Sequence, residues 1–266
     1  MHTGIRTRLA AAALLTFASG AVLADAAADK AASEKVLQCM RGNIPPNVRI
    51  QEFELTSADR SGGTRTLRGR LYAARDGELA RVMLQIESPS DLAGAAYLVR
   101  EGKGSDEIYL YLPATRKVRR ISGPNQDGKL WGTDLSFNDI KQLQNAYNGA
   151  SLKLEPAAAL DGRQAYVLGM VPRAGETSRY TQVHAWIDQQ TCVAVKVEFS
   201  DAGGVRKRIL AKAKDLKQNG KFWYATDAEM SDLQSATHTN LKVLNLSSPE
   251  KIAERLFNPN TFYLGG

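Results

Sequence analysis

Apolar and polar residues alternate with a period of two along most of the chain after residue 48. This alternation is typical of strands that have one buried and one exposed face. The inward-facing positions of the clearest runs are Leu67, Leu71, Val82, Leu84, Ile86, Ile108, Leu110, Leu112, Val183, Ala185, Ile187, Val193, Val195, Val197, Phe199, Leu241 and Val243. The pattern predicts a chain dominated by β-strands.

Short turn dipeptides separate several of these runs. They are Asp76-Gly77, Asp161-Gly162, Gly203-Gly204 and Asn219-Gly220, and such pairs accept the positive φ that tight hairpin turns require. Strands joined by tight turns are antiparallel. We therefore expect a meander of about ten antiparallel strands, which tends to curl rather than stay flat.

Two earlier segments have helical periodicity. Residues 27–40 are rich in alanine, and Gly42 with the prolines after it predicts the end of that helix. Ser136-Phe137-Asn138-Asp139 has the form of a capping box that opens a second helix. An apolar stripe continues from it at helical spacing, and its members are Phe137, Ile140, Leu143 and Tyr147.

A third helix is predicted near the C-terminus. Ser248-Pro249-Glu250 supplies a cap, a proline and an early acidic residue, and Ile252, Leu256 and Phe257 would form its buried side. A helix with one apolar stripe has to bury it, and the concave face of a curved sheet is the obvious place. The predicted fold class is mainly β (α+β): a curved antiparallel sheet with a few amphipathic helices lodged in its concave face.

The N-terminus has the pattern of an export signal. Arg6 and Arg8 make it cationic, residues 9–17 are apolar, and Val22-Leu23-Ala24 fits a small-residue cleavage site. The apolar run is too short to span a membrane stably. We expect residues 1–24 to be a cleavable signal peptide. Since no linker composition follows, we expect residues 25–266 to form one domain that works in the periplasm.

Charge and cysteine content refine this picture. The signal contributes two positive charges to a formal net charge of +7, so the mature chain is mildly basic, which is compatible with anionic headgroups or an acidic partner. Cys39 and Cys192 are the cysteines, and no CxxC motif occurs. In an oxidising compartment we expect them to form a disulfide; the alternative is two small buried residues.

Candidate catalytic and metal-binding residues are sparse. His184 and His238 do not belong to a cluster of Cys, His and carboxylate ligands such as zinc requires. No Gly-x-Ser-x-Gly motif, P-loop or dinucleotide fingerprint occurs. Asp106 and Glu107 are adjacent, so on a strand they point to opposite faces. We therefore expect a protein that is not an enzyme, with no catalytic residue, metal or cofactor.

Two basic segments have competing interpretations. They are Arg116-Lys117-Val118-Arg119-Arg120 and residues 206–214. Each is compatible with a solvated sheet face or a protected strand edge. The functional alternative is docking to anionic headgroups or to the acidic surface of a membrane partner. Stacking aromatic residues do not interleave with these cations, which argues against nucleic acid as a partner.

Three stretches, in this order, carry a family resemblance. They are residues 81–99, the tyrosine-leucine-proline run and arginine repeat within residues 106–121, and Leu130-Trp131-Gly132-Thr133-Asp134. The chain resembles the outer-membrane lipoprotein-sorting protein family, in the longer branch of LolA-like proteins, most densely from Leu67 to Tyr147. The resemblance implies an incomplete antiparallel β-barrel with a hydrophobic cavity for acyl chains. It also implies shuttling across the periplasm and a large inner-membrane lipid exporter as partner.

The alternation and the resemblance together indicate candidate site residues. An apolar trough would be lined by Leu84, Ile86, Leu110, Leu112, Val195 and Val197. The helical stripe would plug this trough as a lid, through Phe137, Ile140, Leu143 and Tyr147. Headgroups or the exporter would meet Arg116, Arg119 and Arg120. We expect a monomeric carrier of lipid or lipoprotein acyl chains that contacts membranes transiently.

Two other functions are compatible with the same features. A lipid-sensing regulator of envelope stress would use the same half-barrel, but such regulators carry a second domain, which the sequence does not show. An envelope enzyme that modifies lipids would need a nucleophile or metal constellation, and no such constellation is evident.

Overall fold

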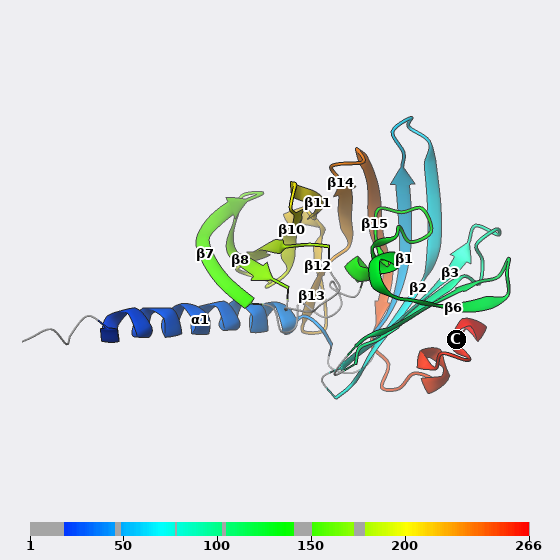
Figure 1. The fold of residues 1–266 in the computed structure, drawn as a ribbon, viewed down its shortest axis with the longest axis horizontal. Coiled ribbons are helices and arrows are strands. Elements are labelled where there is room, and N and C mark those ends of the chain that lie inside the picture. Colours follow the sequence, from blue (N-terminus) through cyan, green and yellow to red (C-terminus); the bar gives the residue numbers. More distant parts are fainter. Residues whose placement is uncertain are drawn as a thin grey trace, which may run out of the picture.

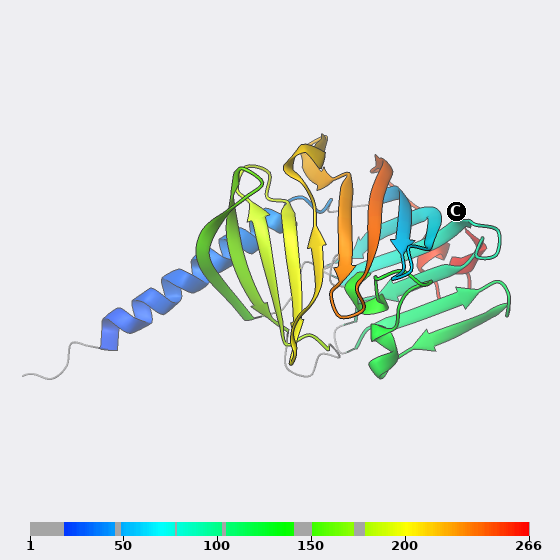
Figure 2. The same ribbon diagram turned by 90° about the horizontal axis from the view of Figure 1, so that it is seen from above.

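Thirteen strands form one antiparallel sheet in this computed structural model, which describes residues 19–45, 49–77, 79–102, 105–140, 151–172 and 179–265. The strand order is β6-β5-β4-β3-β2-β1-β15-β14-β11-β10-β9-β8-β7 (Figures 1 and 2). The first and last strands of the chain, β1 and β15, pair with each other in the interior of the sheet. The first and last described strands are thereby tied into one layer.

The elements have the following bounds. One half of the sheet consists of β1 (Arg49–Ala58), β2 (Thr64–Asp76), β3 (Leu79–Ser88), β4 (Ala96–Arg100), β5 (Glu107–Leu112) and β6 (Lys117–Ile121). The other half consists of β7 (Ser151–Leu160), β8 (Arg163–Val171), β9 (Gln182–Asp188), β10 (Ala194–Asp201), β11 (Gly204–Leu210), β14 (Asp227–Asp232) and β15 (Thr237–Ser247). A separate hairpin is formed by β12 (Leu216–Asn219) and β13 (Phe222–Ala225). The helices are α1 (Ser19–Arg41) and the short 3-10 helices η1 (Gly123–Asp127), η2 (Ala213–Asp215), η3 (Glu254–Phe257) and η4 (Phe262–Leu264).

The predicted hairpin turns are confirmed. Asp76-Gly77, Asp161-Gly162, Gly203-Gly204 and Asn219-Gly220 connect β2 to β3, β7 to β8, β10 to β11 and β12 to β13. The second residue of each pair is a glycine with a positive φ, a conformation that a residue with a Cβ adopts only at a cost. At Asp161-Gly162 both residues have positive φ, 50° and 74°, as a type I′ turn requires.

The sheet curves but stays open, which confirms the predicted fold class. Strand twist accumulates across the sheet and rolls it toward a barrel. The outer strands β6 and β7 do not pair with each other in the described part of the chain. Inward-pointing side chains on the concave side form the main hydrophobic core, which includes Leu55, Leu84, Tyr97, Leu168 and Phe199.

Helix α1 confirms the prediction for residues 27–40 and begins earlier, at Ser19. Its C-terminal half lies against β7 and β8, where Val36 and Leu37 join the main core. Its N-terminal half projects beyond the β7 edge of the sheet (Figures 1 and 2). The helix ends where the Gly42 N–H donates to the Gln38 carbonyl at 2.9 Å.

The C-terminal segment differs from the prediction. Residues 248–253 are not helical, and only the short helices η3 and η4 follow. Their buried Leu256, Phe257 and Phe262 pack on the convex side of the sheet, against Met83 and Leu98, and so this segment does not lie in the concave face. The physical reason is that β3 and β4 carry apolar residues on both faces, and strands of that kind need a cover on each side.

Candidate functional site

The concave side of the sheet contains an apolar cavity. Its volume is about 180 Å³. Its apolar walls are Phe53, Leu55, Leu71, Leu84, Leu130, Leu135, Ile140, Ile209, Ala228, Met230 and Leu241. Gln51 and Thr239 are its polar lining residues. A mostly apolar hollow with a few polar groups is the usual form of a small-ligand site.

The described part of the connection between β6 and β7, which reaches residue 140, contributes to the wall of this cavity. The two strands are the opposite edges of the open sheet. Residues Leu130, Leu135 and Ile140 of this connection form part of the cavity wall. We refer to residues 129–140 as the lid segment.

The predicted capping box in the lid segment is confirmed. The Ser136 N–H donates to Asp139 Oδ2 at 2.8 Å, and the Asp139 N–H donates to Ser136 Oγ at 3.1 Å. The helix begins at Phe137, whose carbonyl accepts the Tyr97 hydroxyl of β4 at 2.9 Å. Burial raises the pKa of Tyr97, so its hydroxyl stays protonated as a donor.

The predicted lid residues are only partly within the described residues. Phe137 and Ile140 are buried in the main core, and Ile140 also lines the cavity. The ring of Phe137 lies 5.5 Å from the ring of Tyr97. Leu143 and Tyr147 fall outside the described residues.

Most of the predicted trough residues lie on the concave side. Leu84 lines the cavity, and Ile86 and Val197 are buried in the same core. Leu110 and Leu112 are half-buried against the edge of that core. The structure thus brings five of the six positions onto one continuous surface.

Val195 lies apart from the other predicted trough residues. It lines a separate small hollow together with Leu160 and Ala165. The pairing of β10 with β9 is irregular between Ala194 and Lys196, and a bulge of this kind shifts the alternation by one residue. Ala194, rather than Val195, therefore packs against the main core.

Asp134 anchors the lid segment to β15. Its side-chain oxygens accept the hydroxyls of Thr237 and Thr239, the latter at 2.8 Å. Its N–H donates to Thr239 Oγ1 at 2.9 Å, and Lys129 Nζ donates to Asp134 Oδ1 at 2.8 Å. Because Asp134 is buried, these bonds satisfy a carboxylate that would otherwise be costly to desolvate.

A buried ion pair fixes the start of the lid helix. Lys207 of β11 donates through Nζ to Asp139 Oδ2 at 2.6 Å and to the Asp134 carbonyl at 2.7 Å. The Lys207 and Asp139 side chains are 5% and 0% exposed. Tyr180 donates to Asp139 Oδ1 at 2.9 Å, and burial together with the neighbouring Asp139 raises the pKa of Tyr180.

Sequence reasoning missed the role of Lys207. In the sequence Lys207 is one member of the basic segment of residues 206–214, with Arg206 and Arg208 on either side of it. On a strand, residues between two outward-facing positions point inward, so the alternation itself could have placed Lys207 in the core. The cavity-lining Phe53 and Leu55 alternate around Glu54 in the same way and could have been found by the same signal.

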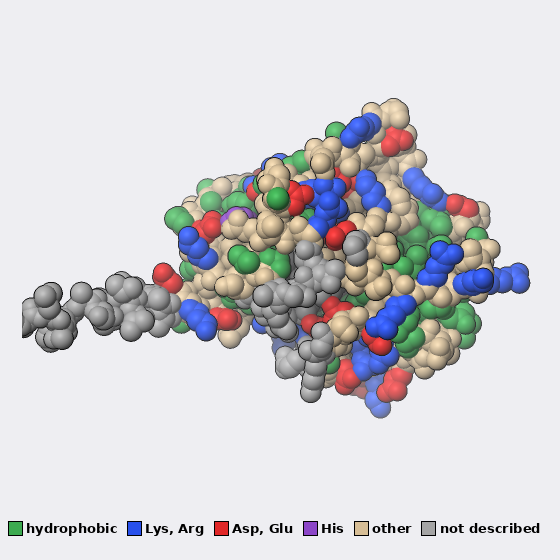
Figure 3. Space-filling model, viewed as in Figure 1, with side chains coloured by type: hydrophobic (Ala, Val, Ile, Leu, Met, Phe, Trp, Pro, Cys, Tyr) green, Lys and Arg blue, Asp and Glu red, His purple; other side chains and the backbone are tan. Residues whose placement is uncertain are grey.

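The three arginines predicted to dock are exposed but do not share one face. Arg119 lies opposite Leu110 of β5, which packs on the concave core, whereas Arg120 lies opposite Tyr109, which packs on the convex cluster. Arg116 is in the turn between β5 and β6, with a φ of 51°. On the face drawn in Figure 3, Lys and Arg side chains are spread among acidic, polar and apolar ones rather than joined in one patch.

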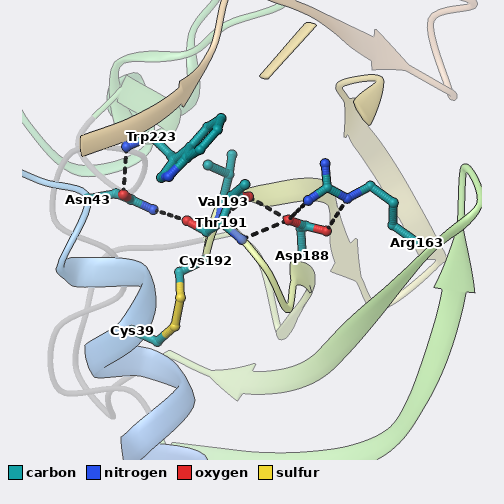
Figure 4. The surroundings of a disulfide bond; sticks show 8 residues. All are labelled: Cys39, Asn43, Arg163, Asp188, Thr191, Cys192, Val193 and Trp223. Atoms are coloured by element: carbon teal, nitrogen blue, oxygen red, sulfur yellow. Dashed lines mark hydrogen bonds and ion pairs between the residues drawn. A yellow bond between two sulfur atoms is a disulfide. The ribbon is translucent and has the colours of Figure 1, made fainter. Parts of the chain in front are cut away.

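Cys39 and Cys192 form a disulfide, which confirms the prediction (Figure 4). The bridge joins α1 to the turn between β9 and β10, with a Cα–Cα distance of 5.5 Å. Close to it, Asn43 Nδ2 donates to the Thr191 carbonyl at 2.7 Å, and Asn43 Oδ1 accepts the Trp223 N–H at 2.8 Å. The end of α1 is therefore held to the sheet by polar contacts as well as by the bridge.

The described residues do not form a metal-binding cluster. No three His, Cys, Asp or Glu side chains among them are placed to hold an ion. His184 lies on the convex face, where its Nε2 is 3.1 Å from Glu155 Oε1 and 3.2 Å from Gln182 Nε2. Among the residues that the structure describes, no helix has both the length and the hydrophobicity needed to cross a membrane.

Solved structures with the same fold cover most of this chain. It is similar to a putative outer membrane lipoprotein-sorting protein domain from Vibrio parahaemolyticus (23% identity, TM-score 0.79, 88% of this chain and 99% of that one). It is also similar to a DUF1329 family protein from Desulfovibrio piger (21%, 0.80, 86% and 97%). A third similar structure is a LolA superfamily protein from Nitrosomonas europaea (17%, 0.68, 85% and 97%). These similarities confirm the expected fold.

Comparison at the level of sequence identifies the family to which the chain belongs. Comparison with curated proteins found no match. A family model described as "Uncharacterized protein" matches residues 78–263, which is more than half of the chain. The chain therefore belongs to that family, and its fold is that of the LolA-like, outer-membrane lipoprotein-sorting proteins.

Proposed function

We propose that this protein is a periplasmic carrier that binds lipid or lipoprotein acyl chains in its concave cavity and moves them between the inner and outer membranes. The observation that carries the proposal is the apolar cavity whose wall includes Leu130, Leu135 and Ile140 of the lid segment. In this proposal residues 1–24 are a cleaved signal, residues 25–266 are one monomeric domain, and an inner-membrane lipid exporter supplies the cargo.

The geometry is suited to the physical problem of moving an acyl chain through water. Exposing a full acyl chain costs about 0.8 kcal/mol per methylene, or roughly 10 kcal/mol in total. A carrier has to shield that surface and still release it. An open sheet with a separate lid segment supports this, because the lid can move without breaking the strand ladder.

The exposed arginines are proposed to guide the carrier to its membrane partners. Arg119 lies at the rim of the concave face, and Arg116 and Arg120 are beside it on the β5–β6 hairpin. Cations at this position would be attracted to anionic headgroups or to an acidic exporter surface. The names of the similar structures, which include a lipoprotein-sorting domain, support a carrier of this kind.

Native cargo provides the direct test. The protein would be exported with its own signal, purified without detergent, extracted with organic solvent and examined by mass spectrometry. We expect acyl lipid to co-purify in near-stoichiometric amount. Absence of lipid, together with failure of the purified protein to bind a fluorescent palmitate analogue, would contradict the proposal.

Filling the cavity should block binding. Ala228 of β14 is a small residue of the cavity wall, opposite Leu241. We expect Ala228→Trp to lower the affinity for the fluorescent palmitate analogue at least about tenfold, because the indole takes the space of the acyl chain. The cost in stability should stay below about 1 kcal/mol, since the ring enters free space rather than a filled core.

The matched control is Ala159→Trp on the outer strand β7, where the side chain is exposed. It adds the same indole away from the cavity and should leave the affinity unchanged. Fluorescence titration measures both affinities, and urea unfolding measures both stabilities. Equal affinities for the two variants would show that the acyl chain binds elsewhere.

A further inference from the structure

The hairpin of β12 and β13 stands outside the large sheet. It is a separate two-stranded unit in the connection between β11 and β14, which are neighbours in the sheet (Figures 1 and 2). Within the described part of the chain, the hairpin residues belong neither to the main core nor to the convex cluster. A hairpin by itself is marginally stable in water, so other contacts have to hold this one in place.

Polar contacts attach the hairpin to the rest of the protein. The Trp223 N–H donates to Asn43 Oδ1 at 2.8 Å (Figure 4), and Asn219 Nδ2 donates to the Leu246 carbonyl at 2.9 Å. At the base of the hairpin, the Thr226 N–H donates to the Asp215 carbonyl at 2.8 Å. These bonds use backbone groups and asparagine side chains, and so the aromatic rings of the hairpin are not needed to hold it.

Three consecutive aromatic residues occupy β13. They are Phe222, Trp223 and Tyr224, and each is half-buried. Phe222 and Tyr224 lie on one face of the hairpin, where Tyr224 is opposite the exposed Lys217 of β12. Aromatic rings that remain partly in water, beside lysine side chains, are typical of protein segments at membrane–water interfaces.

An exposed leucine adds apolar surface beside the hairpin. Leu244 of β15 is 53% exposed, because a bulge in the pairing with β1 leaves it without a partner there. It lies between two residues of β15 that contact the hairpin and its base. The Val243 N–H donates to the Thr226 carbonyl at 2.9 Å, and the Leu246 carbonyl accepts Asn219.

The hairpin and the residues before it are strongly basic. Four exposed lysines, with a single acidic residue among them, occupy residues 211–225: Lys212, Lys214, Lys217 and Lys221. Lys221 Nζ lies 5.4 Å from the centre of the Phe222 ring. A lysine near an anionic bilayer strengthens binding by about fivefold. Lysine is depleted in protein–protein interfaces, so this composition favours a lipid surface over a protein partner.

We propose that the β12–β13 hairpin docks the protein on an anionic phospholipid membrane. The lysines contact the headgroups, and Phe222, Tyr224 and Leu244 enter the interfacial layer. This surface is separate from the acyl-chain cavity and from the β5–β6 arginines, and so it goes beyond the carrier function. The two are nevertheless close along the chain. Ala228 of the cavity wall is three residues after Ala225, which is at most about 10 Å of extended chain.

Co-flotation with lipid vesicles tests the proposal on the mature protein. We expect binding to vesicles of phosphatidylglycerol and phosphatidylcholine to be at least about tenfold tighter than binding to phosphatidylcholine alone, and to weaken as salt is added. Lys217→Gln combined with Lys221→Gln should weaken binding to the anionic vesicles by about 10- to 30-fold. Phe222→Ser should weaken it by about tenfold, because the phenyl ring no longer leaves water.

The matched control is Lys30→Gln combined with Lys153→Gln, which removes two exposed lysines elsewhere. Lys30 is about 20 Å along α1 from Asn43. Lys153 lies near the start of β7, far along that strand from Asp161, whose carboxylate accepts the Ala213 N–H. This variant has the same net charge as the hairpin variant and should bind the anionic vesicles nearly as well as the unaltered protein does. Equal weakening of the two double variants would show that net charge alone causes binding, and would overturn the assignment to the hairpin.

The failure of this inference differs from failure of the carrier function. If the unaltered protein bound anionic and neutral vesicles equally, or bound neither, docking by the hairpin would be overturned, and this comparison needs no variant to fold. The Lys217→Gln and Lys221→Gln double variant should keep the full affinity for the fluorescent palmitate analogue, which also shows that it is folded. Vesicle binding without any binding of that analogue would support docking and contradict the carrier function alone.

Discussion

Replacing Cys39 and Cys192 together by serine is expected to lower the free energy of unfolding by about 5 kcal/mol. The two cysteines are 153 residues apart in sequence, and the chain-entropy relation assigns about this value to a loop of that length. The effect acts mainly on the unfolded chain, because Asn43 still holds the end of α1 to Thr191 and Trp223. Urea unfolding under non-reducing conditions measures the difference.

A reductant provides the control for this prediction. Dithiothreitol should destabilise the unaltered protein to the level of the double serine variant and should not change the variant further. Far-UV circular dichroism of the folded variant should match that of the unaltered protein. Identical urea midpoints for the unaltered protein and the variant, with and without reductant, would contradict the prediction.

Lys207→Met is expected to cost about 3–5 kcal/mol of stability. The substitution keeps the apolar stem but removes the charge beneath the lid segment, and Asp139 is left as a covered carboxylate without its 2.6 Å cationic partner. Removing one member of a buried ion pair typically has this cost, because the remaining charge is not solvated. Thermal and urea unfolding measure the change.

Two further variants separate the buried charge from loss of a lysine in general. Lys212→Met changes an exposed lysine in the segment after β11 and should have an effect near zero. Lys207→Met combined with Asp139→Leu removes both charges and should recover part of the stability. Recovery should be incomplete, because Asp139 also accepts the Ser136 N–H and the Tyr180 hydroxyl. A cost below about 1 kcal/mol for Lys207→Met would contradict the role of the pair.

The single variant Lys207→Met also tests the proposed carrier function. Lys207 joins β11 to the lid segment through both Asp139 and the Asp134 carbonyl. If the lid covers a bound acyl chain, loosening this attachment should speed exchange of the fluorescent palmitate analogue. Stopped-flow displacement would measure that rate under conditions in which the variant is still folded.

Local features were predictable wherever the relevant chemistry lies within a few residues. The Asp161-Gly162 turn follows from the positive φ that its position requires. The capping box of Ser136 and Asp139 joins neighbouring backbone groups, so no distant element is needed to specify it. The inward positions of Leu84 and Ile86 follow from simple alternation on a regular strand.

Features that depend on distant partners were not predictable in this way. The bulge at Ala194–Lys196 belongs to the pairing of two strands, and it moves Val195 away from the cavity. Arg119 and Arg120 have the same chemistry, but their faces depend on how β6 pairs with β5. The C-terminal segment packs on the convex side because β3 and β4 expose apolar residues there, whereas its own sequence indicated only a helix start.

Periodicity and turn motifs are thus enough to predict a curved antiparallel sheet with tight hairpins and a capped helix. These properties arise from backbone conformation and alternation, which neighbouring residues control. Only the folded structure shows that Lys207 reaches Asp139 and that Val195 lies away from the main core. Such contacts join residues far apart in sequence, and only the pairing and curvature of the strands bring them together.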